Sequence, residues 1–220
     1  MSKMGRPAMQ FILTICSVFI VVFGLKMFNQ YLLLKFSLVF RMGLMIITQW
    51  TLFFVPGLLM LTQNEKLSDI GFSNERIPKQ ILLGILLALL MSAILTVLPI
   101  LVGLKDMVGS TSYTHAWQFA FEFVYKVLGV ALAEELVFRG YLFYKLLEIK
   151  DSRWLAIIVS SMLFGLFHIF SGNPVQVFMT AVIGFIYCIY REKFRDCTLL
   201  SLIIAHGLYD GMIVLWVSSL

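Results

Sequence analysis

Long apolar stretches, separated by short polar ones, run along the whole chain. A helix needs about 20 apolar residues to cross the hydrocarbon core of a bilayer. Seven stretches approach that length: residues 8–26, 38–61, 80–104, 116–137, 154–170, 175–190 and 198–218. The helical pattern of the fourth continues to about Leu147. Because these runs are continuous rather than alternating, we expect an all-α, polytopic transmembrane helix bundle of about seven spans and not a β-barrel.

Composition agrees with a membrane protein. The chain is 60% hydrophobic and only 13% charged, whereas a soluble domain has roughly 45–50% apolar and about 25% charged residues. Its net charge of +5 comes from Lys and Arg clustered between the apolar runs, which indicates membrane topology and argues against nucleic acid binding. Since the loops are short, we expect one multi-pass integral membrane domain over residues 1–220 in the cell membrane, with its motifs in residues 116–218.

Lys and Arg are distributed unequally between the two sides of the predicted bundle. If the N-terminus is cytoplasmic, eleven of them lie on the cytoplasmic side, and only Lys26, Lys35, Lys105 and, at a span boundary, Arg41 lie outside. Because Lys and Arg favour the cytoplasmic side, we expect a cytoplasmic N-terminus and an outer C-terminus.

Three apolar stretches contain ionisable groups at helical spacing, E-E-L-V-F-R at 134–139, F-G-L-F-H at 164–168 and H-G-L-Y-D at 206–210. An ionisable group inside a bilayer costs roughly 2.5–3.5 kcal/mol on insertion scales, so it is kept where it is paired, lines a cavity or takes part in chemistry. We therefore expect the three clusters to meet in one buried polar site.

The two adjacent glutamates of the first cluster differ in their surroundings. Glu135 precedes Arg139 by one helical turn, in the order that favours an ion pair. Glu134 is turned about 100° away, which leaves it as a free carboxylate suited to general acid–base catalysis. Glu122 and Lys126, four residues apart in the same segment, predict a structural ion pair.

The other two clusters each place a histidine in a different span. Phe164 and His168 share one helix face. His206 and Asp210 are four residues apart, so the carboxylate can fix the tautomer of the imidazole, or both groups can bind a common ligand. The G-x-x-x-G of residues 207–211 permits close helix packing in the same segment.

The motifs E-E-x-x-x-R, F-x-x-x-H and H-x-x-x-N/D, in this order on successive membrane helices, resemble those of the CAAX protease and bacteriocin-processing family of intramembrane endopeptidases. The type II CAAX prenyl proteases belong to that family. The resemblance implies hydrolysis of a peptide bond within the membrane. Glu134 would activate a water molecule, His168 would hold or polarise it, and His206 and Asp210 would stabilise the oxyanion.

Supporting roles follow from the same resemblance for Glu135, Arg139 and Phe164, which would brace the site. The chain departs from the prenyl proteases at residue 210, where they have an asparagine. An ionised Asp210 cannot donate a hydrogen bond and would repel an oxyanion. Asp210 is therefore expected either to be protonated or to orient His206, which then donates.

A metal-free mechanism is favoured, with zinc as the alternative. His168, His206 and Asp210 could supply the three protein ligands of a catalytic zinc site and leave Glu134 free as the base. The chain has no H-E-x-x-H, in which two ligands and the base share one helix.

The leading hypothesis is an endopeptidase with a site open to the cytoplasm and a membrane-associated peptide or protein as its substrate. Alternatives are a non-catalytic protein of bacteriocin self-immunity or membrane regulation, and a proton-coupled transporter. For His168 to join the other groups from the end of a short span, we expect the turn at residues 171–174 to be buried within the protein.

Overall fold

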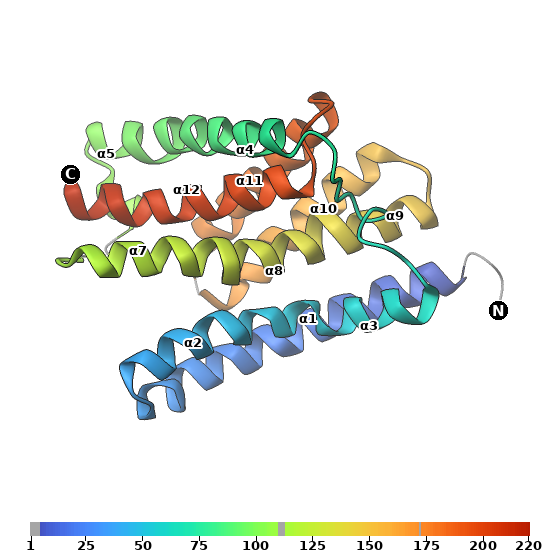
Figure 1. The fold of residues 1–220 in the computed structure, drawn as a ribbon, viewed down its shortest axis with the longest axis horizontal. Coiled ribbons are helices and arrows are strands. Elements are labelled where there is room, and N and C mark those ends of the chain that lie inside the picture. The colour runs from blue at the N-terminus through green and yellow to red at the C-terminus, as the bar shows by residue number, and fades with distance from the viewer. Residues whose placement is uncertain (1–4, 110–112, 172) are drawn as a thin grey trace.

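The computed structural model describes residues 5–109, 113–171 and 173–220, and the described part is helical without strands (Figure 1). Seven long helical runs follow one another. They are α1 (Gly5–Tyr31); α2 (Leu38–Gln49) with η2 (Trp50–Phe53) and α3 (Phe54–Gln63); α4 (Ile77–Ser92) with η3 (Ala93–Val97) and α5 (Leu98–Leu101); the run 116–149; α10 (Arg153–Phe167); α11 (Pro174–Lys193); and α12 (Leu199–Ser219). These runs confirm the predicted all-α membrane bundle.

The run 116–149 is built from α7 (Ala116–Val124), η4 (Tyr125–Ala131), α8 (Leu132–Glu135), η5 (Leu136–Leu142) and α9 (Phe143–Ile149). Among the described residues, six helices are long and apolar enough to cross a membrane, and this run is not one of them. Its seven charged residues explain the difference. A helix that carries so many charges is stable in a bilayer only when other helices surround it.

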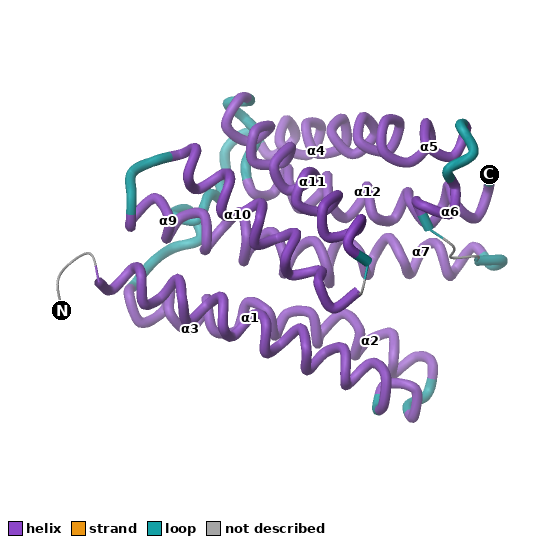
Figure 2. The backbone as a smooth tube through the Cα atoms, turned by 180° about the vertical axis from the view of Figure 1, so that it is seen from behind, coloured by secondary structure: helices purple, strands orange, loops and turns teal. Residues whose placement is uncertain are grey.

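The neighbours of this run provide that surrounding. Figure 1 shows α4 beside α12, α12 beside the run 116–149, and α1 paired with α2 and α3 on the opposite flank. In the reverse view α10 and α11 lie across the run and α12 (Figure 2). The run 116–149 is therefore covered on several sides, and its middle section is buried.

Small residues let the helices that carry the three clusters approach closely. A Cβ atom at Gly207 would lie 2.5 Å from the Cα of Val127, and one at Gly211 would lie 2.6 Å from the ring of Phe123. A Cβ atom at Gly165 would lie 2.6 Å from the carbonyl oxygen of Val177 in α11. The predicted close packing of residues 207–211 is thus confirmed, and it holds α12 against α7 and η4.

The turn between α10 and α11 differs from the prediction. Asn173 and Pro174 are exposed rather than buried, and Gly172 lies outside the described residues. Asn173 is polar because it caps α11, accepting hydrogen bonds from the backbone N–H groups of Val175 and Gln176. In both views, the ends of α10 and α11 that this turn joins nevertheless lie part-way along the bundle, short of the C-terminal end of α12 (Figure 1 and Figure 2).

Replacing Gly207 with alanine tests the packing of α12. The new methyl group would overlap the backbone of Val127, and overpacking of this kind costs about 1–3 kcal/mol. We expect a lower unfolding temperature in detergent micelles for Gly207→Ala. Gly43→Ala is the matched control, because no atom lies within 4 Å of a Cβ there. Equal unfolding temperatures for the two variants would contradict the packing described here.

Candidate active site

Glu134 and Glu135 lie in α8, between two π-helical segments, η4 and η5. π-helical turns are rare and occur frequently at functional sites, because they change which residues a helix presents on one face. Here they flank the pair of glutamates on both sides. The local backbone therefore marks the same position as the first sequence cluster.

Glu135 forms the predicted ion pair with Arg139. Its Oε1 lies 3.1 Å from Nη1 of Arg139, and both side chains are fully buried. The guanidinium carbon of Arg139 lies 3.8 Å from the ring centroid of Phe164, a cation–π arrangement that joins the first cluster to the second. Glu135, Arg139 and Phe164 thus form one packed unit at the centre of the protein.

The same carboxylate oxygen also holds His206. Nδ1 of His206 lies 2.8 Å from Oε1 of Glu135. Because a carboxylate only accepts, Nδ1 donates this hydrogen bond and carries a proton. The tautomer is therefore fixed by Glu135 and not by Asp210, which corrects the expectation that Asp210 orients the imidazole.

Nε2 of His206 faces two further carboxylates. It lies 3.8 Å from Oε2 of Glu134 and 3.7 Å from Oδ2 of Asp210. Within the described residues, Oε2 of Glu134 makes no hydrogen bond, although it is buried. Glu134 is the less restrained of the two glutamates, as its position on the helix predicts.

His168 is oriented by its own helix. Its Nδ1 lies 2.9 Å from the carbonyl oxygen of Phe164. Since a carbonyl oxygen accepts, Nδ1 carries the proton, and Nε2 keeps a lone pair that can accept a hydrogen bond from water.

Asp210 has a partner that the sequence patterns did not predict. Nζ of Lys126 lies 3.6 Å from its Oδ2. The predicted ion pair between Lys126 and Glu122 is therefore wrong. Glu122 instead lies beside Tyr113, whose hydroxyl donates to Oε2 of Glu122 over 3.4 Å. The close packing of α12 on η4 brings Asp210 within reach of Lys126 and explains the change of partner.

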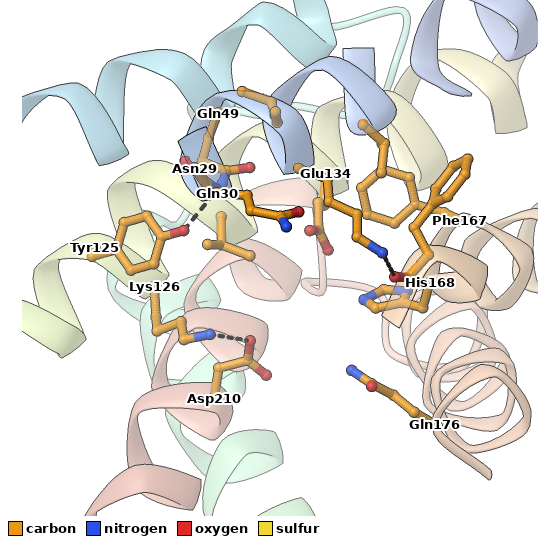
Figure 3. A pocket seen from close by; sticks show the side chains of 15 residues that line it. Asn29, Gln30, Gln49, Tyr125, Lys126, Glu134, Phe167, His168, Gln176 and Asp210 are labelled. Carbon is orange, nitrogen blue, oxygen red and sulfur yellow. Dashed lines mark hydrogen bonds and ion pairs between the residues drawn. The ribbon is translucent and has the colours of Figure 1, made fainter. Parts of the chain in front are cut away.

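A cavity of about 700 Å³ joins these groups (Figure 3). Glu134, His168, Lys126 and Asp210 line it, and His206 lies behind the lining with Nε2 facing the carboxylates of Glu134 and Asp210. Other polar side chains in the lining are those of Lys26, Asn29, Gln30, Gln49, Tyr125 and Gln176. The three clusters therefore do meet at one site, as the sequence predicts.

The cavity lies toward the side of the bundle opposite the N-terminus. Its lining includes Asn29 and Gln30 near the end of α1, and Gln176 at the start of α11. Described residues of the opposite face, in the segments 64–76, 150–152 and 194–198, do not line it. A cytoplasmic N-terminus and a cavity open to the cytoplasm, both expected from sequence, therefore exclude each other.

Among the described residues, no group of three His, Cys, Asp or Glu side chains is placed to hold a metal ion, and this includes His168, His206 and Asp210. The hydrogen bond from Nδ1 of His206 to Glu135 leaves Nε2 of the imidazole facing Glu134 and Asp210.

Lys126 is the charged lining residue that sequence reasoning assigned elsewhere. It precedes Glu134 by eight residues, about two turns of a helix, so periodicity alone could have placed both on one face. Helical periodicity could not have predicted the four lining carboxamides, because they come from three other elements and follow no common spacing. They are those of Asn29, Gln30, Gln49 and Gln176.

Comparison with known proteins agrees with the geometry. Residues 116–212 match the model of the family described as type II CAAX prenyl endopeptidase Rce1-like. That segment contains all three clusters. Neither the curated proteins nor the solved structures contain a match. The resemblance to CAAX proteases stated from the motifs is thereby confirmed.

Removing each of the two adjacent glutamates is expected to change the stability of the protein by very different amounts. Glu135→Ala would leave the buried guanidinium of Arg139 without its carboxylate, and breaking a buried pair costs about 3–5 kcal/mol. Glu134→Ala removes a carboxylate whose buried oxygen makes no hydrogen bond in the described residues. We expect a much lower unfolding temperature for Glu135→Ala, and one close to that of the unmodified protein for Glu134→Ala. Similar losses in both variants would contradict these separate roles.

The side on which the cavity opens can be measured by cysteine labelling. Gln30→Cys reports on the cavity face, and Glu75→Cys reports on the opposite face, where Glu75 is exposed. In a Cys16→Ser background, we expect a membrane-impermeant maleimide to label Gln30→Cys on intact cells, and Glu75→Cys only after lysis. The reverse pattern would place the N-terminus outside and the cavity toward the cytoplasm.

Proposed function

We propose that this membrane protein hydrolyses a peptide bond with a water molecule activated by Glu134. The proposal starts from residues 116–212, which belong to the Rce1-like family of type II CAAX prenyl endopeptidases. The family is one of proteases, and its members act within membranes. The mechanism and the substrate of this chain are inferred from its own residues.

The observation that carries the proposal is the position of the Glu134 carboxylate. It lines the cavity and lies 3.8 Å from Nε2 of His206, and its Oε2 makes no hydrogen bond in the described residues. A general base must be free to accept a proton from water within the site. Oε2 of Glu135 also makes no hydrogen bond there, but Glu135 does not line the cavity, and Arg139 and His206 hold its Oε1.

Two imidazoles complete the chemistry. Water bound between Glu134 and Nε2 of His168 gives its proton to Glu134, and its oxygen adds to the carbonyl carbon of the peptide. The carbonyl oxygen becomes an oxyanion, which a protonated His206 stabilises by donating from Nε2. Collapse of the intermediate breaks the C–N bond, and Glu134 returns the proton to the leaving nitrogen.

The remainder of the cavity suits an extended peptide. Carboxamides both donate and accept hydrogen bonds, as peptide groups do, and four of them line the cavity: Asn29, Gln30, Gln49 and Gln176. Apolar side chains such as those of Val22, Leu25 and Phe167 line the same cavity. A membrane-associated peptide or protein segment, with a polar backbone and apolar side chains, fits this combination.

Cleavage by purified protein in lipid tests the proposal. The substrates are a panel of membrane-associated peptides with leader-bearing and prenylated members. We expect Glu134→Gln and His168→Ala each to lower kcat about 10²–10⁴-fold, the usual contribution of acid–base groups. Glu75→Gln, at an exposed position far from the cavity, is the control.

Two outcomes would change the conclusion. We expect cleavage to continue in the presence of a strong chelator. If the chelator abolishes cleavage and added zinc restores it, the reaction depends on a metal site. If the wild-type protein cleaves no peptide while both it and Glu134→Gln protect cells equally against a bacteriocin, the enzyme hypothesis is wrong and the chain acts as an immunity protein.

A further inference from the structure

Asp210 creates an electrostatic problem at the site. Its Oδ2 lies 3.7 Å from Nε2 of His206, the group that would stabilise the oxyanion. An ionised carboxylate there accepts hydrogen bonds but donates none, and its charge repels a developing oxyanion. A protease with this residue therefore needs a positive charge in the same place.

Lys126 supplies such a charge. Its ammonium lies 3.6 Å from Oδ2 of Asp210, and both side chains line the cavity and are about a quarter exposed, at 24% and 23%. Figure 3 shows the two side chains pointing toward each other at the cavity wall. An ammonium has three N–H donors, so the contact with Asp210 leaves donors available to a bound substrate.

The fold holds this pair in place. Gly207, one turn before Asp210, packs against the backbone of Val127, the neighbour of Lys126. The ammonium of Lys126 lies 3.6 Å from Asp210 of α12 and 5.8 Å from the ring centroid of Tyr125, its neighbour in the run 116–149. Both groups favour a cation at this position.

Around His206, formal charges balance among the groups in contact with one another, and Lys26, the other lining lysine, is hydrogen-bonded to the carbonyl oxygen of Phe170 instead. Glu134, Glu135 and Asp210 contribute three negative charges, and Arg139 offsets one of them. Lys126 offsets the second, and a protonated His206 offsets the third. Without Lys126, the carboxylate of Asp210 would have no lysine or arginine beside it among the described residues when the oxyanion forms.

We propose that Lys126 is a further catalytic residue, whose ammonium neutralises Asp210 and stabilises the oxyanion of the tetrahedral intermediate. The proposal rests on the endopeptidase function inferred above. In this chain, the lysine–aspartate pair takes over the part that the motif resemblance implies for an asparagine at residue 210.

A double-mutant cycle tests this role. Loss of one oxyanion-stabilising donor lowers kcat about 10²–10³-fold, and we expect a loss of that size in Lys126→Gln, which removes the positive charge and withdraws the donor on a shorter side chain. The double variant Lys126→Gln, Asp210→Asn has neither charge and regains an amide donor, so we expect it to recover at least about tenfold over the single variant. Lys126→Arg keeps the charge and should retain most of the activity. Lys35→Gln, at an exposed position outside the cavity, is the control.

A second measurement separates catalysis from a structural ion pair. A phosphinate peptide carries the negative charge of the intermediate, whereas the matching uncleaved amide does not. We expect Lys126→Gln to weaken phosphinate binding at least about tenfold and amide binding much less, with little change in unfolding temperature. Equal weakening of both ligands, or a lower unfolding temperature with unchanged kcat, would show that the pair only holds helices together.

The same experiments distinguish failure of this proposal from failure of the enzyme hypothesis. If wild-type protein cleaves peptides and Lys126→Gln does so with the same kcat and KM, Lys126 has no catalytic role. If wild-type protein neither cleaves peptides nor binds the phosphinate, the endopeptidase function itself is wrong, and the role of Lys126 is wrong with it.

Discussion

One buried carboxylate connects the parts of this protein. Oε1 of Glu135 lies within 3.1 Å of Arg139 on its own helix and within 2.8 Å of His206 on α12. Arg139 in turn stacks on Phe164 of α10. Three membrane helices are thereby joined through a charged centre from which water is excluded. Such a centre holds its geometry because each member left alone would be a costly unpaired charge.

This buried centre also leaves the neighbouring groups free for chemistry. Since Glu135 fixes the imidazole of His206 through Nδ1, the other ring nitrogen is available on the side of the cavity. Glu134, the next residue along, avoids the buried network and lines the cavity instead. Adjacent positions on one helix thus separate a structural carboxylate from a reactive one, because successive residues point about 100° apart.

Sequence patterns predicted much of this arrangement. Continuous apolar runs predicted the helices, and the spacing of Glu135 and Arg139 predicted their ion pair, because both depend on local periodicity. The cost of charge in lipid predicted that three clusters share one site. Ion pairs and hydrogen bonds between side chains of different helices could not be predicted from local spacing in the same way. Lys126 pairs with Asp210 rather than Glu122, and Glu135 rather than Asp210 orients His206, because tertiary packing decides between equally spaced candidates.

The short fifth span has a consequence for the lipid around it. From Arg153 to Phe170 it contains 18 residues, about 27 Å of helix, and the exposed polar residues Asn173 and Gln176 follow directly. In a bilayer with a hydrocarbon core of about 30 Å, a span of this length creates a small hydrophobic mismatch, which local thinning or snorkelling of the flanking side chains relieves. Because Gln176 also lines the cavity, the thickness of the bilayer is a physical variable that bears on this edge of the site.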